Sequence, residues 1–263
     1  MTEKQRPSME RTLFNAKTAE DVDFCLDRGD NIEITNGRFG CTPFIYYCRE
    51  GNIDVVVRLI NRGCDINIRY GGHFYIMNGM EYVCINGHYD LLVELLKFPQ
   101  VRNLINSIGK TSTLGYACYK GLCDIVDILL ENGADVNHRD ECGRTPLYIA
   151  LSNGNPIIVR KLLDTGADVN AVDNDNCTCI HNYSITLECL DIVLCYGGLN
   201  LINKQDDYGY TPLHIAIQAG NIAIIPRLLD CCADPNIPDM KGITPLEYAK
   251  STEFTEVIEL INR

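Results

Sequence analysis

Apolar residues in the stretch GRTPLYIALSNGNPIIVRKLLDTGADVN (residues 143–170) follow the spacing of two short amphipathic helices. Leu147 and Ala150 lie three positions apart, so they share one face of the first helix. The small side chain of Ala150 indicates that a neighbouring helix packs closely against it. The apolar face of the second helix consists of Ile158, Val159, Leu162 and Leu163.

Polar residues, glycine and proline mark where these two helices begin and end. Thr145 precedes Pro146, a residue that loses nothing at the first helical position by lacking an N–H group. Gly154 ends the first helix, Asn155 caps the second, and Gly166 ends it. The stretch therefore predicts a helix–turn–helix hairpin followed by a polar turn, ADVN.

The same pattern returns as GYTPLHIAIQAGNIAIIPRLLDCCADPN (209–236), 66 residues later, which is twice 33. The position of Pro146 is filled at this spacing by Cys179, Pro212 and Pro245, and at nearly the same spacing upstream by Thr113, Gly79 and Pro43. A fixed period of this length is typical of stacked supersecondary units. One hairpin cannot bury its apolar face alone, so the hairpins are expected to stack.

The motifs TPLxxAxxxG and LLxxGADxN at a period of 33 resemble those of ankyrin-repeat proteins. The resemblance covers nearly the whole chain and implies an all-α solenoid, in one domain over residues 8–263, of about eight helix–turn–helix repeats with degenerate caps at both ends. Residues 1–7 are expected to form a flexible N-terminus. The expected repeats are 8–37, 38–72, 73–106, 107–139, 140–172, 173–205, 206–238 and 239–263.

Three departures from the motif predict local irregularities. Repeat 3 replaces Thr-Pro-Leu by residues 78–80 (NGM) and has a longer preceding turn, RYGGHFYIM. Repeat 6 lacks the glycine between its helices, and its first helix is expected to open at His181. Pro226 falls inside the second helix of repeat 7, where proline costs about 3 kcal/mol, so that helix should be kinked or shortened.

The composition of the chain favours some kinds of partner and cellular compartment over others. The net charge of −12 argues against binding to a nucleic-acid backbone and favours a protein partner with a basic patch. No apolar run approaches the roughly 18 residues that a membrane span needs. The 14 cysteines mostly lie within apolar helical patterns of a chain without a signal peptide. We therefore expect reduced thiols and a monomer in the cytoplasm.

No motif in the chain predicts catalysis, a metal or a cofactor. Gly109-Lys110-Thr111 lacks the upstream glycine of a phosphate-binding loop, since position 104 is Leu. Cys177, Cys179 and His181 have no second ligand pair at a spacing that suits zinc. His88 and His214 fall on positions that are structural in ankyrin proteins. We expect a non-enzymatic protein.

Resemblance to ankyrin proteins implies that a partner binds the concave surface, formed by the projecting turns and the exposed side of the first helices. Aromatic residues at turn tips are unusual and favour binding, although some of them could fold back onto neighbouring turns. Two anchors are expected, an apolar N-terminal one and a tyrosine-rich one in repeat 7. The candidate contact residues are Arg38, Phe39, Arg49, Phe74, Tyr75, Met77, Tyr119, Arg144, Tyr208, Tyr210 and Met240.

Three functional hypotheses follow. The first is a protein-binding module that acts as an adaptor or inhibitor. The second is a host-directed effector in the host cytosol, because 29 Ile against only 12 Ala resembles the composition of ankyrin proteins from large DNA viruses or intracellular bacteria. The third is a substrate of an asparaginyl hydroxylase, whose pattern resembles Leu eight residues before Asn, as at Asn67, Asn137, Asn170 and Asn236.

Overall fold

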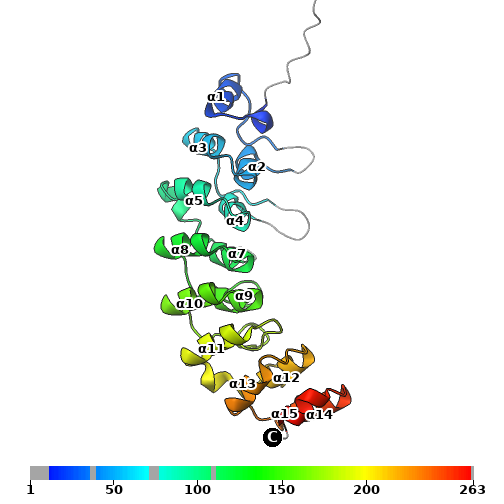
Figure 1. Ribbon diagram of the computed structural model, residues 1–263. Coiled ribbons are helices and arrows are strands. Elements are labelled where there is room, and N and C mark those ends of the chain that lie inside the picture. The colour runs from blue at the N-terminus through cyan, green and yellow to red at the C-terminus, as the bar shows by residue number, and fades with distance from the viewer. Residues whose placement is uncertain (1–11, 36–39, 71–76, 108–110, 262–263) are drawn as a thin grey trace, which may run out of the picture. The chain divides into compact units, whose positions relative to one another are not determined.

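The computed structural model describes residues 12–35, 40–70, 77–107 and 111–261 (Figure 1). Within these ranges the regular secondary structure is helical, and two isolated bridges pair Tyr70 with Met77 and Val172 with Thr178. The chain forms two compact units, Met1–Thr113 and Leu114–Arg263. They are called the N-terminal unit and the C-terminal unit below.

The N-terminal unit is a stack of helical hairpins in two layers (Figure 1). One layer contains the second helices of the repeats and the other contains the first helices, and α2 packs against both α3 and α4. Its elements are η1 (Leu13–Asn15), α1 (Ala19–Asp27), α2 (Pro43–Glu50), α3 (Ile53–Asn61), α4 (Gly79–Ile85), α5 (Tyr89–Leu95) and α6 (Pro99–Arg102).

The C-terminal unit repeats this arrangement, with α10 packed against α8, α9 and α11. Its first-helix layer contains α7 (Thr113–Lys120), α9 (Pro146–Asn153), α12 (Pro212–Gln218) and α14 (Pro245–Ser251). Its second-helix layer contains α8 (Cys123–Glu131), α10 (Pro156–Asp164), α11 (Leu187–Cys195), η2 (Gly198–Leu201), α13 (Ile225–Asp230) and α15 (Thr255–Ile261).

Local chemistry places the helix boundaries where the sequence predicts them. Thr145 accepts a hydrogen bond from the backbone N–H of Tyr148, and α9 ends at Gly154 in the left-handed conformation. The side chain of Asn155 then accepts from the first turn of α10. Leu147 and Ala150 are completely buried, which confirms that the alanine faces a close neighbour.

Repeat 6 differs from the prediction, because no first helix forms between Thr178 and Thr186 and none opens at His181. The Asn182 side chain accepts the backbone N–H of Ser184, and its amide donates to Ser152 Oγ at 2.7 Å. Such a side-chain-to-backbone bond competes with helix formation. His181 has another task, since its Nδ1 accepts from the backbone N–H of Thr178.

The second helix of repeat 7 is shortened, as the proline predicts. α13 has six residues, whereas α3, α8, α10 and α11 each have nine. Pro226 stands in its first turn, where a missing N–H costs no intrahelical bond. Residues 222–224 form a turn before it.

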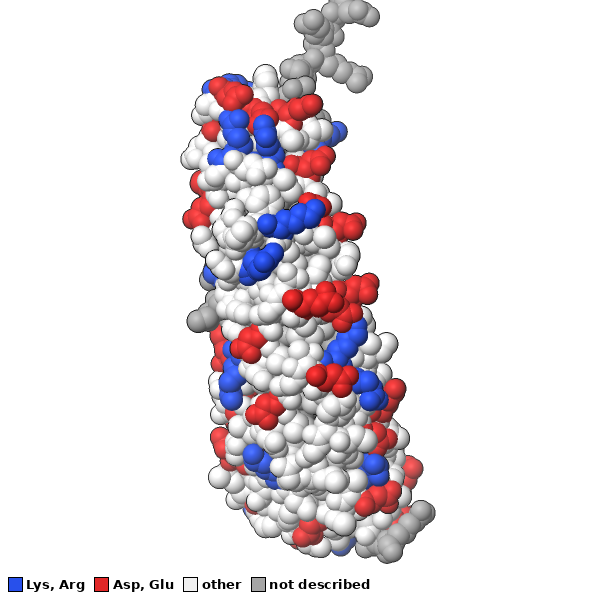
Figure 2. Space-filling view, turned by 90° about the vertical axis from the view of Figure 1, so that its left-hand side faces the viewer, with Lys and Arg blue, Asp and Glu red and all other residues white. Residues whose placement is uncertain are grey.

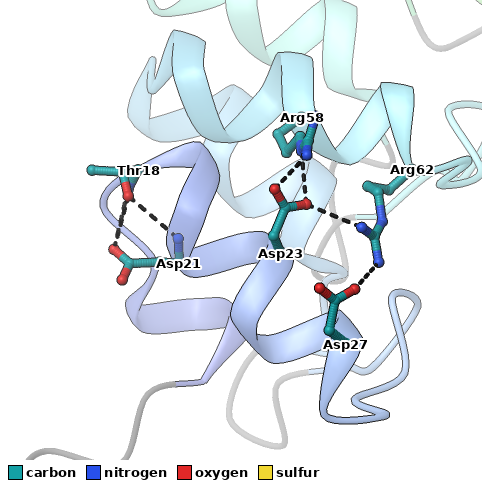
Figure 3. A network of polar contacts seen from close by, with 6 residues as sticks. All are labelled: Thr18, Asp21, Asp23, Asp27, Arg58 and Arg62. Atoms are coloured by element: carbon teal, nitrogen blue, oxygen red, sulfur yellow. Dashed lines mark hydrogen bonds and ion pairs between the residues drawn. The ribbon is translucent and has the colours of Figure 1, made fainter.

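The degenerate first repeat is held against the second by ion pairs (Figure 3). Arg58 of α3 donates to both carboxylate oxygens of Asp23 in α1. Arg62 bridges Asp23 and Asp27 at 3.2 and 2.7 Å. The bond to Arg58 lowers the pKa of Asp23, and Thr18 caps α1. Ion pairs between α1 and α3 therefore hold the degenerate first repeat against the second repeat.

Candidate protein-binding surface

Backbone hydrogen bonds join successive turns between repeats in the C-terminal unit. Their tips are connected by backbone bonds from Asn174 N–H to Cys142 O, from Asp207 N–H to Asp175 O and from Met240 N–H to Tyr208 O, at 2.9 to 3.0 Å. A buried aspartate closes each of three turns by accepting the backbone N–H groups two and four residues further on. These aspartates are Asp140, Asp206 and Asp239.

Tyr208 and Met240 project from these tips into solvent, with 57% and 79% of their surface exposed. Neither side chain is folded back against its own turn. Tyr210 is half-buried, and its ring centroid lies 5.6 Å from that of His214 and 6.4 Å from that of Tyr208. The tyrosine-rich anchor expected in repeat 7 therefore contains one exposed ring, Tyr208, and one half-buried ring, Tyr210, and Met240 of repeat 8 lies exposed on the next tip.

Two further residues of this surface escaped the sequence analysis. Tyr183 is 56% exposed, and Ile243 is also exposed. Burial and then the Asp206 carboxylate raise the pKa of Tyr183, with smaller contributions from Tyr210 and other neighbours. Tyr183 is available because repeat 6 lacks its first helix, and the irregular motif CTCIHNYS was the signal. We call Tyr183, Tyr208, Tyr210, Met240 and Ile243 the tyrosine surface.

Three other predicted contact residues belong to other repeats of the chain. Arg49, near the end of α2, is exposed, lies 3.3 Å from Glu50 and stacks on the Tyr46 ring. Tyr119 is exposed on α7, with the Lys120 ammonium over its ring. Arg144 is half-buried and pairs with the buried carboxylate of Asp140 at 2.9 Å. Arg144 therefore supports its own turn.

The N-terminal anchor needs one correction. Met77 is only 3% exposed, because its backbone pairs with Tyr70 in an isolated bridge and its side chain enters the core. It is not a surface contact. The other members of this anchor, Phe39, Phe74 and Tyr75, lie outside the described residues, as does Arg38, so they stay predictions.

Structural hydrogen bonds engage the side chains of the candidate zinc cluster, which are Cys177, Cys179 and His181. Nε2 of His181 lies 3.0 Å from the carbonyl of Tyr210, and Cys177 Sγ lies 3.7 Å from an Asp206 carboxylate oxygen. Burial raises the pKa of both thiols to about 12. Over the part of the chain that the structure describes, no group of three or more His, Cys, Asp or Glu side chains is arranged to hold a metal ion.

Two other histidines also serve the turns. Nδ1 of His214 accepts from the Thr211 N–H, and its Nε2 lies 3.2 Å from the carbonyl of Ile243 in the next repeat. His88 stands at the cap position of α5 but makes no side-chain capping bond. Its Nε2 lies 2.9 Å from the carbonyl of Arg49 in the preceding repeat. Both side chains join neighbouring repeats, as the resemblance implies.

The four candidate asparagines lie in exposed turns. Asn137 accepts from the backbone N–H of Asp168 and donates to the carbonyl of Gly166. The side-chain amides of Asn67 and Asn236 each donate to the aspartate of their own turn, Asp65 and Asp234. Hydroxylation of these residues stays a prediction, and intact-mass measurement after expression with the hydroxylase would test it.

The described helices include none that is long and apolar enough to cross a membrane. All 14 cysteines are free thiols.

Comparisons with known proteins find the same repeat along most of the chain. A model of ankyrin repeats in three copies matches residues 73–173 and 114–197, a model of many copies matches 196–249, and a single-repeat model matches 39–70. Proteins of this family serve as non-catalytic interaction modules.

Relatives come from very different organisms. An ankyrin repeat protein of fowlpox virus is 37% identical over 192 residues, which are 65% of this chain and 53% of the relative. The ankyrin repeat protein nuc-2 of Neurospora crassa is 28% identical over 255 residues, 83% of this chain and 24% of the relative. A tyrosine-protein kinase of Hydra vulgaris is 30% identical over 162 residues, 59% of this chain and 21% of the relative.

The chain spans about half the length of the viral relative and about a quarter or less of the other two. What these proteins share with it is the repeat array. The stacked hairpins, the capped helix starts and the three family matches together show that this chain belongs to the ankyrin-repeat family.

Proposed function

We propose that this chain is a non-enzymatic protein-binding module that acts as an adaptor or inhibitor, and that the tyrosine surface makes the main contact. The observation that carries the proposal is the exposure of Tyr208 (57%) and Met240 (79%) on turn tips that are themselves joined by backbone hydrogen bonds. Exposed aromatic and methionine side chains are enriched in protein interfaces. A rigid platform lowers the entropy cost of binding them.

Charge around the tyrosine surface favours a partner with a basic patch. Asp207 is exposed on the tip that carries Tyr208, Asp175 is exposed on the preceding tip, and the chain carries a net charge of −12. Lysine or arginine side chains of a partner would contact both the carboxylates and the faces of the tyrosine rings. A nucleic acid is disfavoured by the same charges.

The test is affinity capture from cell lysate with the double variant Tyr208→Ala, Met240→Ala beside the wild type. Loss of two exposed anchors should weaken binding by about 2 kcal/mol or more, enough to remove a micromolar partner from the captured set. Ile157→Ala is the matched control, since Ile157 is 59% exposed on α10 in the other layer. Unchanged capture by the double variant would refute the tyrosine surface as the contact.

The N-terminal anchor is tested separately with Phe39, Phe74 and Tyr75 all replaced by Ala. We expect this triple variant to lose partner capture while its melting temperature stays nearly unchanged. If it captures normally and the C-terminal double variant does not, binding belongs to the tyrosine surface alone.

A host-directed role is the finer form of this proposal. The fowlpox virus relative supports it, as does the excess of Ile over Ala. In this form the chain is a monomer that acts in the reducing host cytosol and blocks or redirects a host protein. Capture from animal-cell lysate should then yield a partner that bacterial lysate lacks. Recovery of the same proteins from both lysates would contradict the host-directed role.

A further inference from the structure

A groove of about 550 Å³ opens on the second-helix layer of the N-terminal unit. Four half-exposed apolar residues of α1, α3 and α5 line it beside Asn61 and charged residues, and we call these four its floor: Ala19, Ile53, Val57 and Val93. Figure 2 looks onto this layer, and in its upper part uncharged surface lies between groups of charged side chains. The groove faces away from the first-helix layer, and nothing in the proposed function uses it.

The charges around the groove leave it negative. Asp54 and Asp90 are exposed on its rim and form no ion pair within the described ranges. The basic residue that lines it, Arg58, is already held by Asp23, as Figure 3 shows. Glu94 is paired with Lys97. Two uncompensated carboxylates therefore flank an apolar floor.

We propose that this groove docks a short amphipathic helix of a partner protein, with apolar side chains on the floor and Lys or Arg side chains against Asp54 and Asp90. Two features of the groove indicate a helical, basic ligand: its walls are helices, and its rim is negatively charged. The walls are helices, and their backbone groups form hydrogen bonds within each helix. They offer no strand edge to which an extended peptide could add as a further strand. Recognition must go through side chains, and a helix presents apolar and basic residues on adjoining faces.

The helix dipole explains why Asp54 and Asp90 stand where they do, and an equivalent aspartate outside the groove provides a control substitution. Asp54 and Asp90 each stand in the first turn of a helix, where a carboxylate is favoured by the helix dipole. That accounts for two acidic residues but not for the open apolar floor between them. Asp124 occupies the same position on α8 in the C-terminal unit and does not line the groove.

The probe is a synthetic peptide of about five helical turns, with Leu on one face and Lys on the other. A second peptide carries Glu in place of Lys, and a third has the composition of the first in an order that is not amphipathic. Binding to the full chain is measured by fluorescence anisotropy, and the site is located by backbone amide chemical shifts. We expect the Leu–Lys peptide alone to bind, with shifts concentrated in α3 and α5.

Variants make the proposal falsifiable. The double variant Asp54→Asn, Asp90→Asn should weaken binding about tenfold. Val57→Arg, which fills the floor and adds a positive charge, should weaken it at least as much while the far-ultraviolet circular dichroism is retained. Asp124→Asn should leave the affinity unchanged. An equal loss in Asp124→Asn, equal binding of the Glu peptide, or full affinity in the groove variants would overturn the proposal.

This test is independent of the proposed function. The variant Tyr208→Ala, Met240→Ala should bind the Leu–Lys peptide with wild-type affinity, because those residues lie on the turns of the C-terminal unit. Peptide shifts that gather at Tyr208 would show that the tyrosine surface, and not the groove, takes basic segments, and would also overturn the assignment.

Discussion

Cys232 is a non-glycine residue with a positive φ, as are Asn176 and Glu253 among the residues that the structure describes. Its φ of 65° lies in the left-handed region, at a position where other repeats place Gly63, Gly133 and Gly166. A side chain there costs about 1 kcal/mol or more, since its Cβ crowds the following carbonyl. Cys232→Gly should therefore raise the free energy of unfolding by about 1 kcal/mol, less the extra entropy of glycine in the unfolded chain.

Thermal unfolding measures this change directly. Gly166→Cys is the mirror control, because φ at Gly166 is 98° and the substitution should lower the melting temperature. A melting temperature that falls with Cys232→Gly would mean that the thiol makes a contact worth more than the strain.

His181 and His214 make the stability of the C-terminal unit dependent on pH. Burial lowers the pKa of each imidazole from its ordinary value of 6.5. Each Nδ1 accepts a backbone N–H, so a proton there would break that bond. The unfolded chain binds the proton more readily, so the stability these neutral rings contribute is complete above pH 6.5 and falls as the pH drops below it.

The expected result is a melting temperature that decreases between pH 7 and pH 5. In the variant His181→Gln, His214→Gln the decrease should be smaller, even if the variant is less stable at pH 7. Parallel curves for the two proteins would show that carboxylates alone cause the acid effect.

Among the elements, α13 has only six residues, and we expect Pro226 to set this length. Asn221 precedes it at the position where Asn155 caps α10, and Pro226 stands where α10 has Arg160. Pro226→Ala should let the helix begin near residue 222, because the missing N–H and the ring clash are removed. Three added helical residues should contribute about 1 kcal/mol at most, after their entropy cost.

Amide chemical shifts of residues 222–224 report the extension. They should become helical in Pro226→Ala and stay unchanged in Arg227→Ala, which removes the neighbouring ion pair with Asp191 instead. Shifts that remain turn-like in Pro226→Ala would assign the short helix to packing against its neighbours.

Repeat 6 should be the least protected element of the C-terminal unit. Residues 180–186 form turns and irregular structure, whereas the equivalent segments α9 and α12 are capped helices. Exposed backbone bonds open at low free energy. Hydrogen exchange of residues 180–186 should therefore be faster than that of Ile149 or Ile215. Equal protection would mean that the bonds of Asn182 to Ser152 and Tyr148 are as stabilising as a helix.

At the scale of the whole molecule, the sequence predicted the structure correctly wherever a repeat follows the motif. Thr145, Gly154 and Asn155 act on their own backbone neighbours, so their roles follow from local chemistry. Met77 was assigned wrongly, because its burial accompanies a backbone pairing with Tyr70 that the repeat motif does not specify. Tyr183 was missed because an absent helix exposes it, and a period of 33 predicts that helix.

The stability of stacked repeats is approximately a sum of terms from each repeat and from its interfaces with its neighbours. A destabilising substitution in one repeat should therefore lower stability mainly in that repeat and the next. In the N-terminal unit, α1 is fastened to α3 through Asp23 and Arg58, a contact that acid and salt both weaken. Arg58→Ala should therefore speed hydrogen exchange in α1, and falling pH should do the same, because the stability from the lowered pKa of Asp23 is lost as the carboxylate is protonated. Protection in α10 and α12 should not change. Lys161→Ala, which breaks the pair with Asp127 between α8 and α10, should give the opposite distribution. If either variant lowered protection evenly along the chain, the array would unfold as one cooperative body and the nearest-neighbour account would fail.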